Sequence, residues 1–198
     1  MKDGFEPMKT RRKAVFLDRD GTINIEMGYL GRPEELVLID TAAEAIAMLN
    51  GKGYAVAVIT NQSGVARGLF EEKDVKAIHE EIARRLLRSG ARVDGWYYCP
   101  HHPSEGVGRY NIQCNCRKPL TGMIEAASND LDVDISESFV VGDSIRDMEL
   151  AWNSGAKAVL VLTGFGLETL KRLARQDKKN IVYIAADILD ASKFICGS

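Results

Sequence analysis

Two aspartates follow directly on a short apolar run near the start of the chain. Asp18 and Asp20 stand two positions apart in the sequence FLDRDGT, which begins at Phe16. Charge at the end of a buried strand is costly, and Gly21 signals a turn that lets both carboxylates face one ligand. Such a pair can supply a nucleophile and a general acid–base, but an Asx turn or a helix cap is the structural alternative. The pair alone does not decide between them.

Three later segments place further polar side chains where strands are expected to end. Thr60 can donate a hydrogen bond to a phosphoryl oxygen, or it can simply close a strand. Lys118, just before Pro119, can neutralise phosphoryl charge or stand in a solvated loop. Asp143 suits a hard divalent cation, and Asp147 suits the first turn of a helix. Together with the aspartate pair, these residue types suit phosphoryl chemistry assisted by a metal ion.

The elements that must position these side chains alternate between strands and helices. Runs that are apolar throughout favour strands covered on both faces, as in a parallel sheet. The sequence predicts six strands: Ala14 to Leu17, Ala55 to Thr60, Gly95 to Cys99, Phe139 to Gly142, Ala158 to Leu162 and Ile181 to Ile184. The alternation favours a doubly wound, mostly parallel α/β sheet, in which ligands bind at the carboxyl ends of the strands.

Helical segments between these strands have recognisable ends. Thr41 and Glu44 have the spacing of a capping box and predict a helix that stops near Gly51 or Gly53. The other two predicted helices run from Glu71 to Ser89, with Gly90 as the stop, and along the apolar stripe Ile145, Met148, Ala151 and Trp152, ended by Gly155. In the first of these, His79 falls on the polar side and is expected to face solvent.

Composition predicts an ordinary compact protein. With 198 residues, 45% hydrophobic and 27% charged, the chain suits one domain over residues 1–198, with residues 1–13 as a polar tail. A net charge of −2 gives no overall attraction to nucleic acid or anionic lipid. No run approaches the roughly 18 apolar residues of a membrane span, and the polar N-terminus lacks a signal-peptide core. We expect a soluble, cytoplasmic monomer that binds neither nucleic acid nor membrane.

Three of the four cysteines lie close together in the sequence, beside two histidines. Three thiols and one imidazole form a set suited to tetrahedral Zn²⁺: Cys99, His101, Cys114 and Cys116. His102 is the alternative ligand, and buried free cysteines are the alternative without metal. Because four protein ligands leave no open position, the predicted role of this zinc-binding loop, residues 99–117, is structural.

The order of these motifs is itself informative. The pattern DxDGT, a strand-terminal Thr, a Lys before Pro and GDxxxD resemble the haloacid dehalogenase (HAD) superfamily of aspartate-dependent phosphatases, over roughly residues 14–166. The resemblance implies that Asp18 is the nucleophile and forms an aspartyl phosphate, while Asp20 is the general acid and then the general base. Acting as an acid requires a protonated Asp20, so its pKa should be tuned by its surroundings.

The same resemblance implies roles for the remaining motif residues. Thr60 and Lys118 stabilise charge on the transferring phosphoryl group, and Asp147 supports the site. Mg²⁺ is held by Asp18, Asp143 and the main-chain carbonyl of Asp20.

The cysteine loop narrows the family further. A Cys-x-His pair that closes with Cys-x-Cys-Arg-Lys-Pro resembles the heptose 1,7-bisphosphate phosphatases and the related histidinol-phosphatase domains. The twelve residues between His101 and Cys114 favour the heptose branch, whose pathway supplies heptose to bacterial surface polysaccharide. Histidinol phosphate is the alternative substrate. Implied contacts to the phosphorylated sugar are Arg19, Glu26, Met27, Gly28, Tyr29, Asn61, Gln62, Ser63 and Arg117. The family often has Lys after the metal aspartate, where this chain has Ser144.

Two further expectations follow from spacing. The stretches from Asp18 to Thr60 and from Thr60 to Lys118 are too short to hold a separate cap domain, so the site should be shallow and screened by residues 23–33 and the zinc-binding loop. A phospho-accepting signalling module of the receiver type has similar residues. Receivers carry the phosphorylated aspartate after the third strand, whereas this chain carries DxD after the first.

Overall fold

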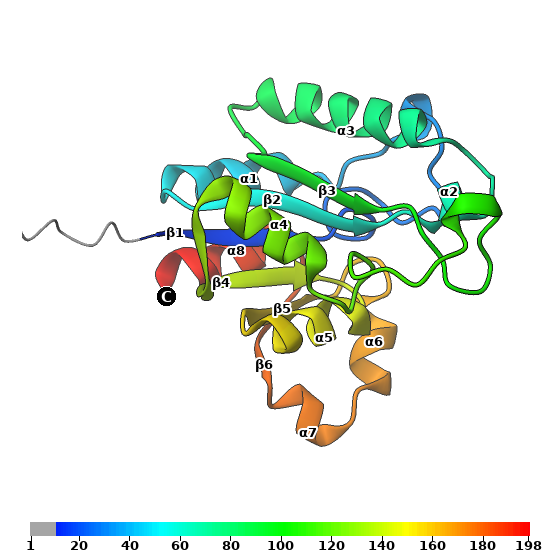
Figure 1. The fold of residues 1–198 in the computed structure, drawn as a ribbon. Coiled ribbons are helices and arrows are strands. Elements are labelled where there is room, and N and C mark those ends of the chain that lie inside the picture. Colours follow the sequence, from blue (N-terminus) through cyan, green and yellow to red (C-terminus); the bar gives the residue numbers. More distant parts are fainter. Residues whose placement is uncertain (1–10) are drawn as a thin grey trace, which may run out of the picture.

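A computed structural model of the chain describes residues 11–198. Six strands form one sheet in the order β3-β2-β1-β4-β5-β6, and each neighbouring pair is parallel (Figure 1). The strands are β1 (Arg12–Leu17), β2 (Ala55–Asn61), β3 (Gly95–Cys99), β4 (Val133–Gly142), β5 (Lys157–Val161) and β6 (Ile181–Ala185). The predicted doubly wound parallel sheet is therefore confirmed.

Two strands, β1 and β4, begin at least two residues earlier than the sequence predicts. β4 begins at Val133, because its first residues pair with the start of β1, where Arg12 lies opposite Val133. Lys13 lies opposite Asp134 in the same ladder, so both Arg12 and Lys13 belong to β1 and not to a polar tail. These charged strand residues are exposed, which hides the strand from an analysis of apolar runs. Residues 1–10 of the expected tail lie outside the described residues.

Helices cover both faces of the sheet. On one face, α1 (Ala42–Gly51), α3 (Glu72–Leu87) and α8 (Ile188–Gly197) pack against inward residues such as Val15 and Leu17. On the other, α4 (Gly122–Leu131) and α5 (Ile145–Ser154) pack against residues such as Ala14 and Phe16. The short elements are η1 (Pro33–Glu35), α2 (Ser63–Ala66), η2 (Gly108–Tyr110), α6 (Gly166–Arg172) and α7 (Arg175–Lys178). This two-sided burial explains why the central strands are apolar throughout.

The helix ends agree only partly with the predictions. The expected capping box at Thr41 is wrong, since the Thr41 hydroxyl donates instead to Asp187 at 3.0 Å, the residue that caps α8. Capping boxes form at two other helices, between Glu71 and Asp74 in α3 and between Ser144 and Asp147 in α5. As predicted, α1 ends at Gly51 and α5 ends at Gly155, whose φ of 81° suits a left-handed C-cap.

His79 is buried, so the prediction that it faces solvent is wrong. The residue is 5% exposed, and its ring stacks on Trp96 of β3 with 4.6 Å between the ring centroids. His79 lies four residues after the buried Val75, on the same face of α3. The buried face of this helix therefore includes a histidine in addition to its aliphatic residues.

The strand order reverses between β1 and β4, which makes their carboxyl ends a topological switch point. Between β1 and β2 the regular elements are η1 and α1, and between β2 and β3 they are α2 and α3. The prediction that no separate cap domain is inserted is therefore confirmed for residues 11–198. Within the same residues, no helix combines the length and the apolar character needed to cross a bilayer.

Candidate active site

Asp18 and Asp143 lie at the switch point, directly after β1 and β4. The Asp18 amide continues the β1–β4 ladder by donating to the Val141 carbonyl at 2.9 Å. Asp143 is buried, and its Oδ2 accepts a hydrogen bond from the Phe165 amide at 2.7 Å. A Cβ at Gly21, where φ is +79°, would overlap the Asp143 carboxylate. Glycine in the DxDG motif therefore lets the first strand end come close to the second.

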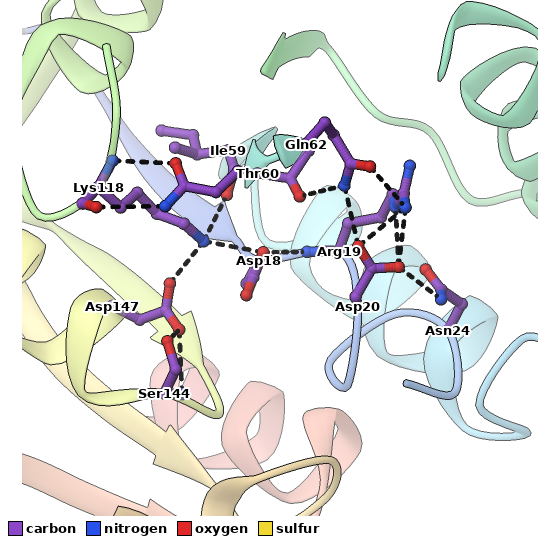
Figure 2. Close-up of polar contacts among 11 residues, drawn as sticks. Asp18, Arg19, Asp20, Asn24, Ile59, Thr60, Gln62, Lys118, Ser144 and Asp147 are labelled. Atoms are coloured by element: carbon purple, nitrogen blue, oxygen red, sulfur yellow. Dashed lines mark hydrogen bonds and ion pairs between the residues drawn. The ribbon is translucent and has the colours of Figure 1, made fainter. Parts of the chain in front are cut away.

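Lys118 lies between two carboxylates at the switch point (Figure 2). Its Nζ lies 2.8 Å from Asp18 Oδ1 and 2.6 Å from Asp147 Oδ1, and it donates to the Ile59 carbonyl at 3.0 Å. The side-chain amide of Asn61 holds the backbone of Lys118. Its Nδ2 donates to the Lys118 carbonyl at 3.2 Å, and its Oδ1 accepts from the Lys118 N–H at 3.0 Å. The end of β2 thus fixes both the position and the direction of the lysine.

The charges of the site are mutually dependent. Burial, and then the charge of Asp147, raise the pKa of Asp18 to about 7. Burial, and then the charge of Asp18, raise the pKa of Asp143 to about 8. Although burial opposes it, Asp147 and Asp18 raise the pKa of Lys118, which stays cationic. One lysine thus leaves a cluster of carboxylates with excess negative charge.

This carboxylate cluster has the donor chemistry of a divalent cation site. Single oxygens of Asp18, Asp143 and Asp147 lie within 4.8 Å of one another. Both Asp147 oxygens are engaged, one by Lys118 and the other by the Ser144 backbone and hydroxyl. The oxygens left to bind a cation belong to Asp18 and Asp143, and oxygen ligands suit Mg²⁺.

Asp20 lies in a separate hydrogen-bond network on the side of Asp18 away from Lys118 (Figure 2). It accepts from Arg19 Nε at 3.1 Å, from Arg19 Nη2 at 2.8 Å, from Asn24 at 3.0 Å and from Gln62 at 2.9 Å. Burial alone would raise the pKa of Asp20, but the charge of Arg19 and these hydrogen bonds hold it below its usual value. The network therefore stabilises the carboxylate, the form that accepts a proton.

An open pocket of about 630 Å³ lies above these groups. The sequence-predicted residues that line it are Asp18, Asp20, Glu26, Gly28, Tyr29, Thr60, Asn61, Gln62, Ser63, Lys118 and Asp143. Its remaining lining residues are Gly64, Ser144, Arg146 and Phe165. Arg146 is the charged residue that the sequence analysis missed. Its place in the first turn of α5, three residues after Asp143, was the signal that could have found it.

Three predicted substrate contacts do not line this pocket. Arg19 is fully buried and points to Asp20. Met27 is half-exposed and is not among the residues that line the pocket. Arg117 lies on the neighbouring surface and donates to the His101 carbonyl at 3.1 Å. Since Arg19 stands between two residues that face the pocket, the turn of the chain directs its side chain the opposite way.

The cysteine and histidine cluster forms next to β3. Its distances are 3.5 Å from Cys99 Sγ to Cys114 Sγ, 3.3 Å from Cys116 Sγ to Cys114 Sγ, and 3.4 Å from Cys116 Sγ to His101 Nδ1. Thiolates about 2.3 Å from one tetrahedral zinc ion are about 3.8 Å apart, so this donor set fits zinc. His102 is turned away, because its Nδ1 accepts from the backbone of Glu105 at 3.0 Å.

Comparisons with known proteins agree with this geometry. Residues 115–191 match the family model described as HAD-hydrolase-like. A D-glycero-beta-D-manno-heptose-1,7-bisphosphate 7-phosphatase of Pasteurella multocida (strain Pm70) is 43% identical over 94% of this chain and 98% of that protein. One of the same name from Rhodopseudomonas palustris is 47% identical over 73% of this chain and 81% of that protein.

A solved structure is also similar. It is D,D-heptose 1,7-bisphosphate phosphatase from B. bronchiseptica, complexed with magnesium and phosphate. Its TM-score is 0.82 at 34% identity, with 93% of this chain and 98% of that chain covered. The chain therefore belongs to the heptose-bisphosphate phosphatase family of HAD-like hydrolases.

Proposed function

We propose that this protein is a Mg²⁺-dependent phosphatase that removes the 7-phosphate of D-glycero-β-D-manno-heptose 1,7-bisphosphate in the cytoplasm. The observation that carries the proposal is the Asp18 carboxylate at the switch point, held by Lys118 and open to the pocket. Within residues 11–198, the hydrogen bonds and ion pairs of this carboxylate all use Oδ1. Oδ2 is thus free to act at the pocket.

In the first step, an Asp18 carboxylate oxygen attacks the phosphorus atom. The new oxygen–phosphorus bond forms as the bond from phosphorus to the sugar oxygen breaks, and Asp20 gives its proton to that oxygen. The sugar leaves as an alcohol, and Asp18 carries an acyl phosphate. An anionic substrate next to Asp20 favours the protonated carboxyl that this step needs, since like charges raise a carboxyl pKa.

In the second step, a water oxygen attacks the phosphorus of the acyl phosphate. Asp20, now a carboxylate, takes a proton from that water, and the bond between phosphorus and Asp18 breaks with its electron pair returning to Asp18. Inorganic phosphate leaves, and both aspartates regain their starting states. Lys118 and the Thr60 hydroxyl stabilise the negative charge on the phosphoryl oxygens in both steps.

Two metals fit the donor sets. Asp18 and Asp143, with the main-chain carbonyl of Asp20, would hold Mg²⁺, which supplies charge neutralisation at the phosphoryl group when bound. Cys99, His101, Cys114 and Cys116 would hold a structural Zn²⁺ and fix the loop that carries Arg117 and Lys118. The fit rests on the carboxylate oxygens left free by Lys118 and on the sulfur distances described above.

The substrate is the more specific part of the proposal. The relatives above carry the β-heptose bisphosphate in their names, and the pocket is open enough for a sugar that extends outward. Histidinol phosphate is the alternative substrate, and a signalling receiver is the alternative class. Asp20, placed to serve the second step, favours turnover over storage of the phosphoryl group. We take the protein to act as a monomer.

The test is phosphate release in the presence of Mg²⁺. We expect kcat/KM for the β anomer of heptose 1,7-bisphosphate to exceed that for the α anomer and for histidinol phosphate. A preference for histidinol phosphate would overturn the substrate assignment but would leave the two-step mechanism through Asp18 standing. A stable phosphoprotein without release of phosphate would favour the receiver class.

A further inference from the structure

We propose that Gln62 is a positioning residue that orients Asp20 and Thr60 together through one amide group, and that Arg19 fixes the direction of that amide. This inference rests on the proposed function and assigns Gln62 and Arg19 a role other than contact with substrate. Gln62 is 4% exposed, and its carboxamide lies between Thr60, near the end of β2, and Asp20, after β1 (Figure 2).

Arg19 determines which end of the amide faces which neighbour. A guanidinium group has only hydrogen-bond donors, so the Gln62 atom that faces Arg19 Nη2 at 3.1 Å must be the carbonyl oxygen. The Gln62 NH₂ group then faces the other way, where it donates to Asp20 Oδ2 at 2.9 Å and to Thr60 Oγ1 at 2.8 Å. Arg19 also donates three hydrogen bonds to Asp20, from Nε and Nη2, which closes a ring of three side chains.

The direction of the amide also fixes the Thr60 hydroxyl. Because Thr60 Oγ1 accepts from Gln62, its own proton points elsewhere, and within residues 11–198 that proton donates to no protein group. Thr60 is buried but lines the pocket. Its proton is therefore free to be donated to a phosphoryl oxygen, as its proposed role requires.

The expected effect of losing the amide is on the transition state rather than on substrate binding. Asp20 acts only while the bond to the leaving oxygen breaks or while water attacks, so a misplaced Asp20 lowers kcat more than it changes KM. The loss must also depend on the leaving group. A poor leaving group, such as a sugar alkoxide, needs the proton from Asp20, whereas 4-nitrophenolate leaves without one.

The experiment compares kcat/KM of Gln62→Met for heptose 1,7-bisphosphate and for 4-nitrophenyl phosphate. Methionine keeps the length of the side chain and removes both polar ends. We expect the sugar phosphate to lose about tenfold or more relative to 4-nitrophenyl phosphate, within the range of about 10²- to 10⁴-fold that general acid–base catalysis supplies. Asp20→Asn should show the same selectivity more strongly, and Arg19→Lys should fall between Gln62→Met and the native chain.

The ratio between two substrates on one sample does not depend on how much of that sample is folded, so a poorly folding variant still gives a decisive result. Gln176→Met, an exposed change on α7, is the matched control and should leave the ratio unchanged. An equal loss on both substrates, or a raised KM with kcat unchanged, would overturn the positioning role. A native chain that releases phosphate from neither compound would overturn the proposed function, and this inference with it.

Discussion

The ammonium group of Lys118 lies 2.8 Å from the Asp18 carboxylate, and both side chains are almost fully buried. The same ammonium lies 2.6 Å from Asp147, so a single cation serves two carboxylates. Lys118 favours the ionised form of Asp18, against the burial that raises the pKa of this carboxyl to about 7. It also holds one carboxylate oxygen and leaves the other open to the pocket.

Replacing Lys118 tests this arrangement. We expect Lys118→Met to lower kcat by about 10²-fold or more, because the phosphoryl group loses the ammonium that stabilises its charge in the proposed mechanism. Stability should fall by roughly 3 to 5 kcal/mol, because two buried carboxylates lose their shared partner. The double variant Lys118→Met, Asp147→Asn should recover much of the stability, measured by urea unfolding, without recovering kcat. An unchanged kcat in the single variant would contradict the role of Lys118.

His79 makes the stability of the fold depend on pH. Burial, and then the charge of Arg19, lower the pKa of His79 from 6.5 to about 3. Below pH 6.5 the unfolded chain therefore binds a proton at this residue that the folded chain does not, so stability falls as the pH falls from 6.5 towards 3. Between pH 7 and pH 5 this one group should cost about 2 kcal/mol.

His79→Phe keeps a ring against Trp96 and removes the titration. Urea unfolding at pH 7 and at pH 5 should show a smaller loss of stability for this variant than for the native chain. Because the other titrating groups are common to both proteins, the difference between the two losses reports His79. Equal losses would mean that His79 binds its proton equally well in the folded and unfolded chains.

The cysteine cluster predicts one zinc ion per chain. Elemental analysis of the protein purified without chelators should find it, and Cys114→Ser should lose it and unfold at a lower temperature, since metal binding is part of the folding free energy. Cys196→Ser is the matched control, because Cys196 lies in α8 outside the cluster, and it should retain the ion. Absence of zinc from the native protein would contradict the assignment of these four residues as a zinc site.

Arg146 predicts how the second phosphate of the substrate is bound. It lines the active-site pocket, and together with Arg117 it also lines the neighbouring surface hollow, so it lies between the site and a second cationic group. Arg146→Ala should raise KM for the 1,7-bisphosphate by about tenfold, the value of one charge-assisted contact, and leave KM for the 7-monophosphate unchanged. Arg88→Ala, on the surface at the end of α3, should change neither KM value.

Much of the fold follows from the sequence because the motif residues stand at the ends of apolar runs. In a parallel sheet those ends share one edge, so Asp18, Thr60 and Asp143 had to come together whatever the details of packing. The early starts of β1 and β4 were not predictable in this way. The first residues of β1 are charged and exposed, and in β4 the exposed Ser136 and Glu137 separate the buried Val133 from the apolar run that begins at Phe139. Pairing between the two strands extends both of them beyond their apolar runs.

The hydrogen-bond network around Asp20 also could not be predicted from the sequence. Arg19 and Gln62 have residue types that suit a phosphate contact, yet Arg19 turns inward and Gln62 bonds both Asp20 and Thr60. The role of Asp20 as an acid predicts that its surroundings tune its pKa. The pKa of Asp20 is lowered, which favours the carboxylate, because the Arg19 guanidinium points towards it. The spacing of residues in the sequence does not reveal where the Arg19 side chain points.

Asp18 is, in the proposed mechanism, the nucleophile that accepts the phosphoryl group. Asp18→Asn changes one oxygen for nitrogen, and the ammonium of Lys118 keeps Asp147 as its partner, so the fold should persist by thermal unfolding. The decisive measurement is phosphate release from heptose 1,7-bisphosphate at saturating Mg²⁺ by the native chain and by Asp18→Asn, side by side. We expect turnover by the native chain and a loss of at least about 10⁴-fold in the variant. A folded Asp18→Asn protein that releases phosphate at the native rate would contradict it.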